Sequence, residues 1–169
     1  MHSLIENFTR EKMDDRLVWL NPPPKCSAGG GRLAVEPAPN TDFWQRTHYG
    51  LAADTGHFLG AHIWGDFVLR TLVRLYPVNE YDQAGLMVRL SDRCWLKTSL
   101  EFGCQDDSKL GAVVTNHGYS DWSFQEASPG VKRISFQVRR TSGDYLVEYA
   151  LCSTGAALSF SPIRLCHLA

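Results

Sequence analysis

Long apolar runs are missing from this chain. No stretch approaches the ~20 consecutive apolar residues that a membrane-spanning helix needs, and residues 1–12 lack the apolar core of a secretory signal peptide. We therefore expect a cytoplasmic protein without a membrane partner.

Charge of one sign is also scarce. The formal net charge is -1, with 21 % charged residues, and the pI is about 6.6. Basic pairs such as Arg139 and Arg140 are isolated in the sequence, so no basic field exists that could hold a phosphate backbone. The sequence predicts no nucleic acid partner.

Metal-binding and disulfide patterns are absent. The 5 cysteines stand at irregular spacings without a C-x-x-C pair, which excludes a regular disulfide framework and a zinc site. His57 and His62 would point to opposite faces of a regular strand, and Asp106 and Asp107 alone offer too few oxygen ligands for calcium. We expect reduced thiols, no bound metal and no cofactor.

No segment has a helical period with capping residues. Short alternating runs separated by turn residues fill the chain instead, and they predict an antiparallel β-sandwich. Phe67–Leu75 alternates cleanly, and Val131–Arg139 forms a hairpin with Tyr145–Leu151. With 169 residues and 44 % hydrophobic residues, we expect one domain over residues 1–169.

The central feature is a hairpin formed by residues 81–90 and 95–102. Leu86, Val88 and Leu90 alternate with Gly85, Met87 and Arg89, and burial of the leucines predicts a register that places Leu90 near Leu96. The opposite face then shows Gln83, Met87, Arg89, Trp95, Lys97 and Glu101. This set suits a ligand rich in hydroxyl groups, and it equally suits an ordinary solvated face.

Two connections are rich in rings. In residues 40–50, Trp44 and His48 either line a ligand cleft or close the end of the sandwich, whereas Phe43 is expected in the core. In residues 116–123, His117, Asp121 and Trp122 leave the same two alternatives, because Asp121 could simply cap a turn.

Four motifs occur in order. They are Asp42-Phe43-Trp44-x-x-Thr47-x-Tyr49-Gly50, Tyr81-Asp82-Gln83-Ala84-Gly85-Leu86, Trp95-x-Lys97-x-x-x-Glu101 and Val114-Thr115-x-x-x-Tyr119-Ser120-Asp121-Trp122-Ser123. Together they resemble the DUF1349 family, over about Trp19 to Tyr149. The resemblance implies an all-β, concanavalin A-like jelly-roll sandwich of two antiparallel sheets. It also implies kinship with lectins, with accessory domains of glycosidases and with a regulator of enolase.

The sequence departs from the family after Leu151. The usual Asp-Gly turn and tryptophan are replaced by residues 152–158, and the closing strand of the family could be lacking. The neighbouring strand would then have an open edge, through which a homodimer could form.

Catalytic signatures are weak. The Glu-x-Asp-x-x-Glu strand of sandwich glycosidases is absent, and no Gly-x-Ser-x-Gly elbow surrounds Ser120. Glu101 and Asp121 are the one carboxylate pair that the sequence leaves open, so a hydrolase is the weakest alternative. We assign no catalytic residues.

Binding is therefore the leading hypothesis. Carbohydrate binding needs aromatic faces for the sugar ring and polar groups for its hydroxyls. The candidate residues are Trp44, His48, Gln83, Trp95, Lys97, Glu101, His117, Asp121 and Trp122. The alternative is a module that binds a protein partner and regulates a metabolic enzyme such as enolase, as the family resemblance implies.

Overall fold

The computed structural model describes residues 3–104, 107–151 and 158–169. The chain divides into two compact units, one formed by residues up to Trp44 with Ala52–Ile63, the other by Gln45–Leu51 with Trp64–Ala169. The expectation of one domain over residues 1–169 stays a prediction.

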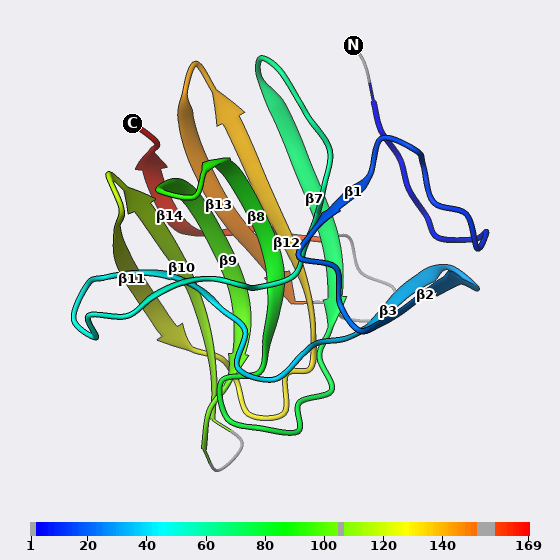
Figure 1. Ribbon diagram of the computed structural model, residues 1–169, viewed down its shortest axis with the longest axis horizontal. Helices are drawn as coiled ribbons and strands as arrows, with labels where there is room; N and C mark the ends of the chain where they lie inside the picture. The colour runs from blue at the N-terminus through cyan, green and yellow to red at the C-terminus, as the bar shows by residue number, and fades with distance from the viewer. Residues whose placement is uncertain (1–2, 105–106, 152–157) are drawn as a thin grey trace. The chain divides into compact units, whose positions relative to one another are not determined.

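The larger unit contains two four-stranded sheets with antiparallel pairing throughout (Figure 1). The first has the order β11-β10-β9-β8 and the second the order β14-β13-β12-β7. Their strands are β7 (Phe67–Arg74), β8 (Gln83–Ser91), β9 (Cys94–Phe102), β10 (Ser108–Asn116), β11 (Tyr119–Glu126), β12 (Arg133–Thr141), β13 (Asp144–Leu151) and β14 (Ser161–His167). Stacking of these sheets confirms the predicted all-β sandwich.

The core lies between the two sheets, where both contribute buried side chains. Leu96 and Leu100 of β9 are fully buried, and so are Phe136 and Val138 of β12. Side chains from both sheets share one cluster, which also takes up the partly buried thiols of Cys94 and Cys166. The alternation in β7 and the β12–β13 hairpin are confirmed as the sequence predicts them.

The register of the β8–β9 hairpin differs from the expectation. Leu96 pairs with Val88, and a register shift lies between Arg89 and Ser91. Leu90 is consequently 62 % exposed. The placement of Leu90 near Leu96 was wrong because the extra residue at the shift changes the face of the residues that follow it. Up to Arg89 the predicted faces are confirmed.

Two segments near the end of the chain form strands that the sequence did not reveal clearly. Residues 119–126 are not a polar connection but strand β11, which pairs along its full length with β10. The tail forms β14, which pairs with β13. β14 therefore occupies the edge of β13 that the expected loss of a closing strand would have left open. Residues 152–157 of the predicted family departure lie outside the described residues.

The smaller unit consists of short paired strands. They are β1 (Val18–Leu20) with β6 (Phe58–Gly60), β2 (Lys25–Gly29) with β3 (Arg32–Glu36), and β4 (Phe43–Gln45) with β5 (Ala52–Asp54), of which only Gln45 at the end of β4 is counted with the larger unit. Phe43 is buried, as expected, and lies so close to Gly56 that a Cβ there would approach the ring to 2.5 Å.

His57 joins two segments of this smaller unit. Its Nδ1 lies 2.6 Å from the carbonyl oxygen of Asn21, and its Nε2 accepts the N–H of Ala38 at 2.9 Å. Because Nε2 accepts a hydrogen bond, the proton of the neutral ring belongs on Nδ1, which donates to Asn21. Both ring nitrogens thus connect His57 to the segments that contain Asn21 and Ala38.

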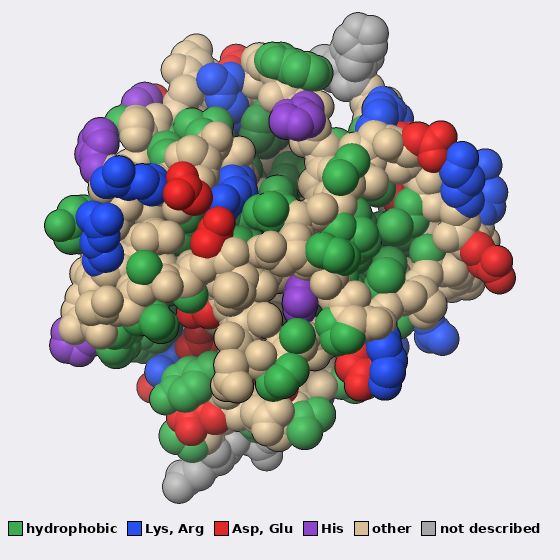
Figure 2. Space-filling model, in the orientation of Figure 1, with side chains coloured by type: hydrophobic (Ala, Val, Ile, Leu, Met, Phe, Trp, Pro, Cys, Tyr) green, Lys and Arg blue, Asp and Glu red, His purple; other side chains and the backbone are tan. Residues whose placement is uncertain are grey.

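The described residues contain no helix long and apolar enough to cross a bilayer. On the face drawn in Figure 2, acidic and basic side chains are interspersed with hydrophobic ones.

Candidate functional site

The candidate site lies on the outer face of the β11-β10-β9-β8 sheet. Residues directly opposite one another in neighbouring strands share a face, so the register aligns the outward side chains in rows that cross the sheet. Read from β8 to β11, the rows are Arg89, Trp95, Thr115 and Ser120; Met87, Lys97, Val113 and Trp122; Gly85, Ser99, Gly111 and Phe124; and Gln83, Glu101, Lys109 and Glu126. We name them the Trp95, Trp122, Gly85 and Gln83 rows.

The Trp95 row is buried. Trp95 and Thr115 are 0 % exposed and Ser120 is 1 % exposed. The hydroxyls of Thr115 and Ser120 lie 2.7 Å apart, and the Gln45 N–H donates to the Ser120 hydroxyl at 2.9 Å. The Trp95 indole N–H donates to the Asp92 carbonyl at 3.2 Å. In this structure Trp95 therefore stabilises the hairpin and offers no ring face to solvent.

The Gly85 row contains two glycines at positions where a side chain does not fit. A Cβ at Gly85 would come within 1.7 Å of the Thr98 carbonyl oxygen, and one at Gly111 within 2.9 Å of the Trp122 indole nitrogen. The Ser99 hydroxyl donates to the Gln83 side-chain oxygen at 3.1 Å. Gly85 is exposed, so backbone itself forms the surface in this part of the sheet.

Trp122 and Phe124 form an aromatic platform at one end of these rows. Their ring centroids lie 4.5 Å apart with an interplanar angle of 31°. Phe124 is 51 % exposed. The Lys109 ammonium lies 5.4 Å from the Trp122 centroid and 5.0 Å from the Phe124 centroid, within the range of cation–π attraction. The platform thus joins one exposed and one half-buried ring to a positive charge.

Four of the predicted site residues meet on this outer face. Gln83 pairs directly with Glu101. Lys97 and Trp122 lie in the Trp122 row, which the Gly85 row separates from the Gln83 row. They provide an amide, a carboxylate, an ammonium and an indole beside the exposed backbone of Gly85. This arrangement can bind a polar ligand that also has an apolar face.

Asp121 lies on the opposite face of the sheet. It pairs with Val114, whose side chain points into the core, and its carboxylate accepts from Arg164 at 2.8 Å. The same guanidinium donates to the Ser123 hydroxyl at 2.7 Å. Since the sheet separates Glu101 from Asp121, these two carboxylates do not flank a common site.

His48 and His117 lie in exposed turns of the larger unit. Both adopt left-handed backbone conformations, with φ of 65° and 53°. The His48 ring meets Tyr49 edge to face at 4.8 Å, and the His117 carbonyl accepts from Arg93 at 3.2 Å. Neither histidine belongs to the four rows.

Trp44 belongs to the smaller unit. It lies in β4 and is 8 % exposed, so its indole offers little surface for stacking. As a ligand-binding residue, Trp44 stays a prediction.

Sequence reasoning missed Lys109, Phe124, Ser99 and the two glycines of the Gly85 row. The signal was the spacing of Trp122 and Phe124, which places both rings on one face of a strand. This spacing was overlooked because the polar residues in 119–126 suggested a loop between strands. Lys109 could not be assigned to the platform without the β10–β11 register.

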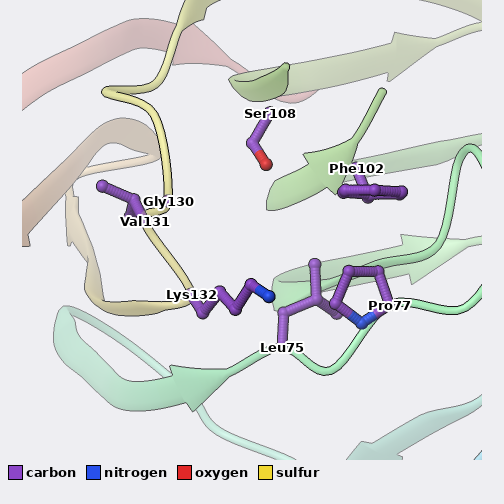
Figure 3. Close-up of a pocket in the computed structure, with 7 residues that line it drawn as sticks. All are labelled: Leu75, Pro77, Phe102, Ser108, Gly130, Val131 and Lys132. Carbon is purple, nitrogen blue, oxygen red and sulfur yellow. The ribbon is translucent and has the colours of Figure 1, made fainter. Parts of the chain in front are cut away.

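A pocket at one end of the sandwich is too small to be the ligand site (Figure 3). It is lined by Leu75, Pro77, Phe102, Ser108, Gly130, Val131 and Lys132. Its volume of about 10 Å³ is at the lower limit for a single water molecule. A sugar ring cannot enter it.

Known proteins with similar sequences and structures support the fold. A Saccharomyces cerevisiae protein named "Regulation of enolase protein 1" is 41 % identical over 106 residues, which are 63 % of this chain and 52 % of that protein. The present chain thus spans about half the length of this relative. A crystal structure of a functionally unknown protein from Saccharomyces cerevisiae matches with a TM-score of 0.82 and 30 % identity, covering 91 % of this chain and 80 % of the other.

A second solved structure is more distant in sequence. The GH43 protein BlXynB from Bacillus licheniformis aligns with a TM-score of 0.64 and 15 % identity, over 93 % of this chain and 29 % of that protein. At this identity the likeness concerns the fold alone.

The family comparison covers most of the chain. The family model described as "Protein of unknown function (DUF1349)" matches residues 19–169, which include both sheets of the larger unit and the β14 tail that the sequence motifs did not reach. The chain belongs to the DUF1349 family.

Proposed function

We propose that this protein is a binding module that holds a carbohydrate on the outer face of the β11-β10-β9-β8 sheet. The observation that carries the proposal is the aromatic platform of Trp122 and Phe124 beside the polar Gln83 row. A pyranose ring has an apolar face that can lie on an indole and hydroxyl groups that need hydrogen-bond partners. Gln83, Lys97 and Glu101 offer such partners on the same face.

Ligand length follows from the spacing of the rows and strands. Neighbouring strands lie about 4.8 Å apart, so the Gly85 row from β11 to β8 spans three such steps, or roughly 14 Å. That length accommodates two or three sugar units laid across the strands. We expect oligosaccharides to bind more tightly than monosaccharides.

Direct titration tests the proposal. Wild-type protein and the Trp122→Ala variant are screened against an oligosaccharide array, and each positive ligand is titrated by calorimetry. We expect wild-type binding with dissociation constants that Trp122→Ala raises about fivefold or more, since a stacked ring contributes on the order of 1 kcal/mol or more.

Trp64→Ala serves as the matched control. Trp64 is 85 % exposed and lies outside the four rows, so its loss should leave binding unchanged. Equal losses in both variants, or no sugar binding by the folded wild-type protein, would refute the proposal.

The second candidate is a regulatory module that contacts a metabolic enzyme. It rests on the 41 % identity to a protein named for regulation of enolase. A suitable surface exists at residues 46–51, where Tyr49 is 63 % exposed and Arg46 stacks at 5.5 Å over Tyr119, itself 58 % exposed. Tyrosine and arginine are enriched among residues that dominate binding energy at protein interfaces.

Size-exclusion chromatography and enolase assays separate this candidate from the first. A regulatory module should co-elute with purified enolase or change its turnover, and Tyr49→Ala should weaken the effect while Trp122→Ala should not. If neither co-elution nor a change in turnover occurs, this candidate is rejected for enolase.

A further inference from the structure

The inference concerns the charge of the ligand and rests on the proposed carbohydrate function. Lys109 lies in the Gln83 row, opposite Glu101 on one side and Glu126 on the other. It therefore sits on the same outer face as the aromatic platform. A lysine flanked by two glutamates in the ladder would ordinarily form ion pairs with them.

Lys109 points elsewhere. Its ammonium is directed over the two rings of the platform, at 5.0 Å from Phe124 and 5.4 Å from Trp122. Across residues 3–104, 107–151 and 158–169, no carboxylate oxygen lies within ion-pair distance of this ammonium. The platform thus presents a positive charge that has aromatic contacts but no described anionic partner.

The position of this charge matters for a stacked sugar. A pyranose ring that lies on Trp122 brings the substituents at its rim close to the Lys109 ammonium, which lies over the two rings at 5.4 Å and 5.0 Å from their centroids. A neutral hydroxymethyl group there would gain one hydrogen bond. A carboxylate there would gain a charge-assisted hydrogen bond, which is roughly twice as strong.

We propose that Lys109 makes the outer face selective for acidic oligosaccharides, with a uronic acid unit stacked on Trp122 and its carboxylate bound by the Lys109 ammonium. Trp122 supplies the stacking surface for any sugar ring, whereas Lys109 distinguishes the acid from its neutral counterpart. No covalent step is involved.

Pairs of ligands that differ in the charge of the carboxyl group test this selectivity. The probes are tri-galacturonic acid, tri-glucuronic acid and the methyl ester of each, because esterification removes the charge while keeping the ring. Binding is measured by calorimetry at low and moderate salt for the wild type, Lys109→Met and Lys132→Met. Methionine keeps the unbranched apolar part of the side chain, and Lys132 is an exposed lysine outside the four rows.

We expect the wild type to bind at least one acid about fivefold or more tightly than its ester, the factor that corresponds to about 1 kcal/mol. Added salt should reduce this preference. Lys109→Met should bind acid and ester equally, whereas Lys132→Met should keep the wild-type ratio.

Other outcomes overturn the inference in distinguishable ways. If acids and esters bind equally to the wild type, or if the preference survives in Lys109→Met, selectivity by Lys109 is wrong while Trp122-dependent sugar binding can still stand. If none of the four probes binds but neutral glycans do, acidic selectivity is wrong. If no sugar binds at all, both proposals fail. If a poly-glutamate peptide binds with the same dependence on Lys109, the site recognises anionic protein segments and not glycans.

Discussion

At the scale of single residues, the local environment separates side chains of the same type. Cys26 and Cys104 are exposed thiols, whereas Cys166 is half-buried against the core between the sheets. Burial raises the pKa of Cys166 to about 11, because desolvation disfavours the thiolate. The pKa of Cys94 is raised for the same reason.

Thiol labelling should reveal this difference. The thiolate is the reactive form, so a raised pKa means a smaller reactive fraction at pH 8 and slower reaction. We expect iodoacetamide to modify Cys26 and Cys104 much faster than Cys166, with the Cys166 rate rising as the pH approaches 11. Peptide mass spectrometry of timed samples measures each site. Equal rates for Cys26 and Cys166 in the folded protein at pH 8 would contradict the assignment.

At the scale of the element, the register of the β8–β9 hairpin decides which of its leucines are buried. Leu96 is 0 % exposed and belongs to the core cluster, whereas Leu90 is 62 % exposed beyond the register shift. The alternation of the sequence gives both residues the same pattern. Only the shift between Arg89 and Ser91 separates them.

Leucine substitutions in this hairpin should therefore have unequal effects. Leu96→Ala removes a fully buried side chain and should lower the free energy of unfolding by about 2–5 kcal/mol. Leu90→Ala removes mostly exposed atoms and should change it by less than about 1 kcal/mol. Urea denaturation followed by tryptophan fluorescence measures both values. A large loss for Leu90→Ala would mean that the predicted pairing near Leu96 was correct after all.

At the scale of the larger unit, the end of the chain ties the two sheets together. Asn116, the last residue of β10, donates from its amide to the His167 carbonyl at 3.0 Å and accepts the Ala169 N–H at 2.9 Å. Leu168 between these two points is 6 % exposed and joins the core. Arg164 of β14 makes a second link by donating to Asp121 and Ser123 of β11.

Loss of the Asn116 amide should weaken the attachment of the tail. Asn116→Ala removes three side-chain hydrogen bonds, those with His167 and Ala169 and the one that the Cys94 thiol donates to Oδ1 at 3.5 Å, and we expect a decrease of about 1–2 kcal/mol in the free energy of unfolding. Asn116→Asp keeps the acceptor for Ala169 but loses the donor to His167, so its effect should be smaller. Hydrogen exchange of the β14 amides should accelerate in the same order. Unchanged exchange in Asn116→Ala would show that Leu168, the Arg164 contacts and the pairing of β14 with β13 hold the tail without the Asn116 amide.

The aromatic platform shows where residue patterns and tertiary structure each contribute. Trp122 was a candidate from its residue type, and Gln83, Lys97 and Glu101 were placed on one face by their alternation in the β8–β9 hairpin. These predictions depend on neighbours in sequence, for which the period of a strand is sufficient. These four residues of the site could therefore be predicted without knowledge of the pairing between distant strands.

Other parts of the site depend on contacts between distant segments. Trp95 shares the alternation of Lys97, yet it is buried in a row with Thr115 and Ser120, where Gln45 also donates a hydrogen bond. Asp121 neighbours Trp122 in the sequence, yet the strand period places it on the other face, where it pairs with Arg164. Neither environment can be read from residue types alone.

The amino-acid sequence by itself determined the all-β class, the alternation that separates core from outer face, and the family to which the chain belongs, because these follow from local periodicity and short motifs. Tertiary structure alone decided the β10–β11 register, the burial of Trp95 and the approach of Lys109 to Trp122 and Phe124. The physical reason is that a strand's period fixes which residues share its face, whereas the neighbouring strand and the segments that pack on that face are set by pairing between distant parts of the chain.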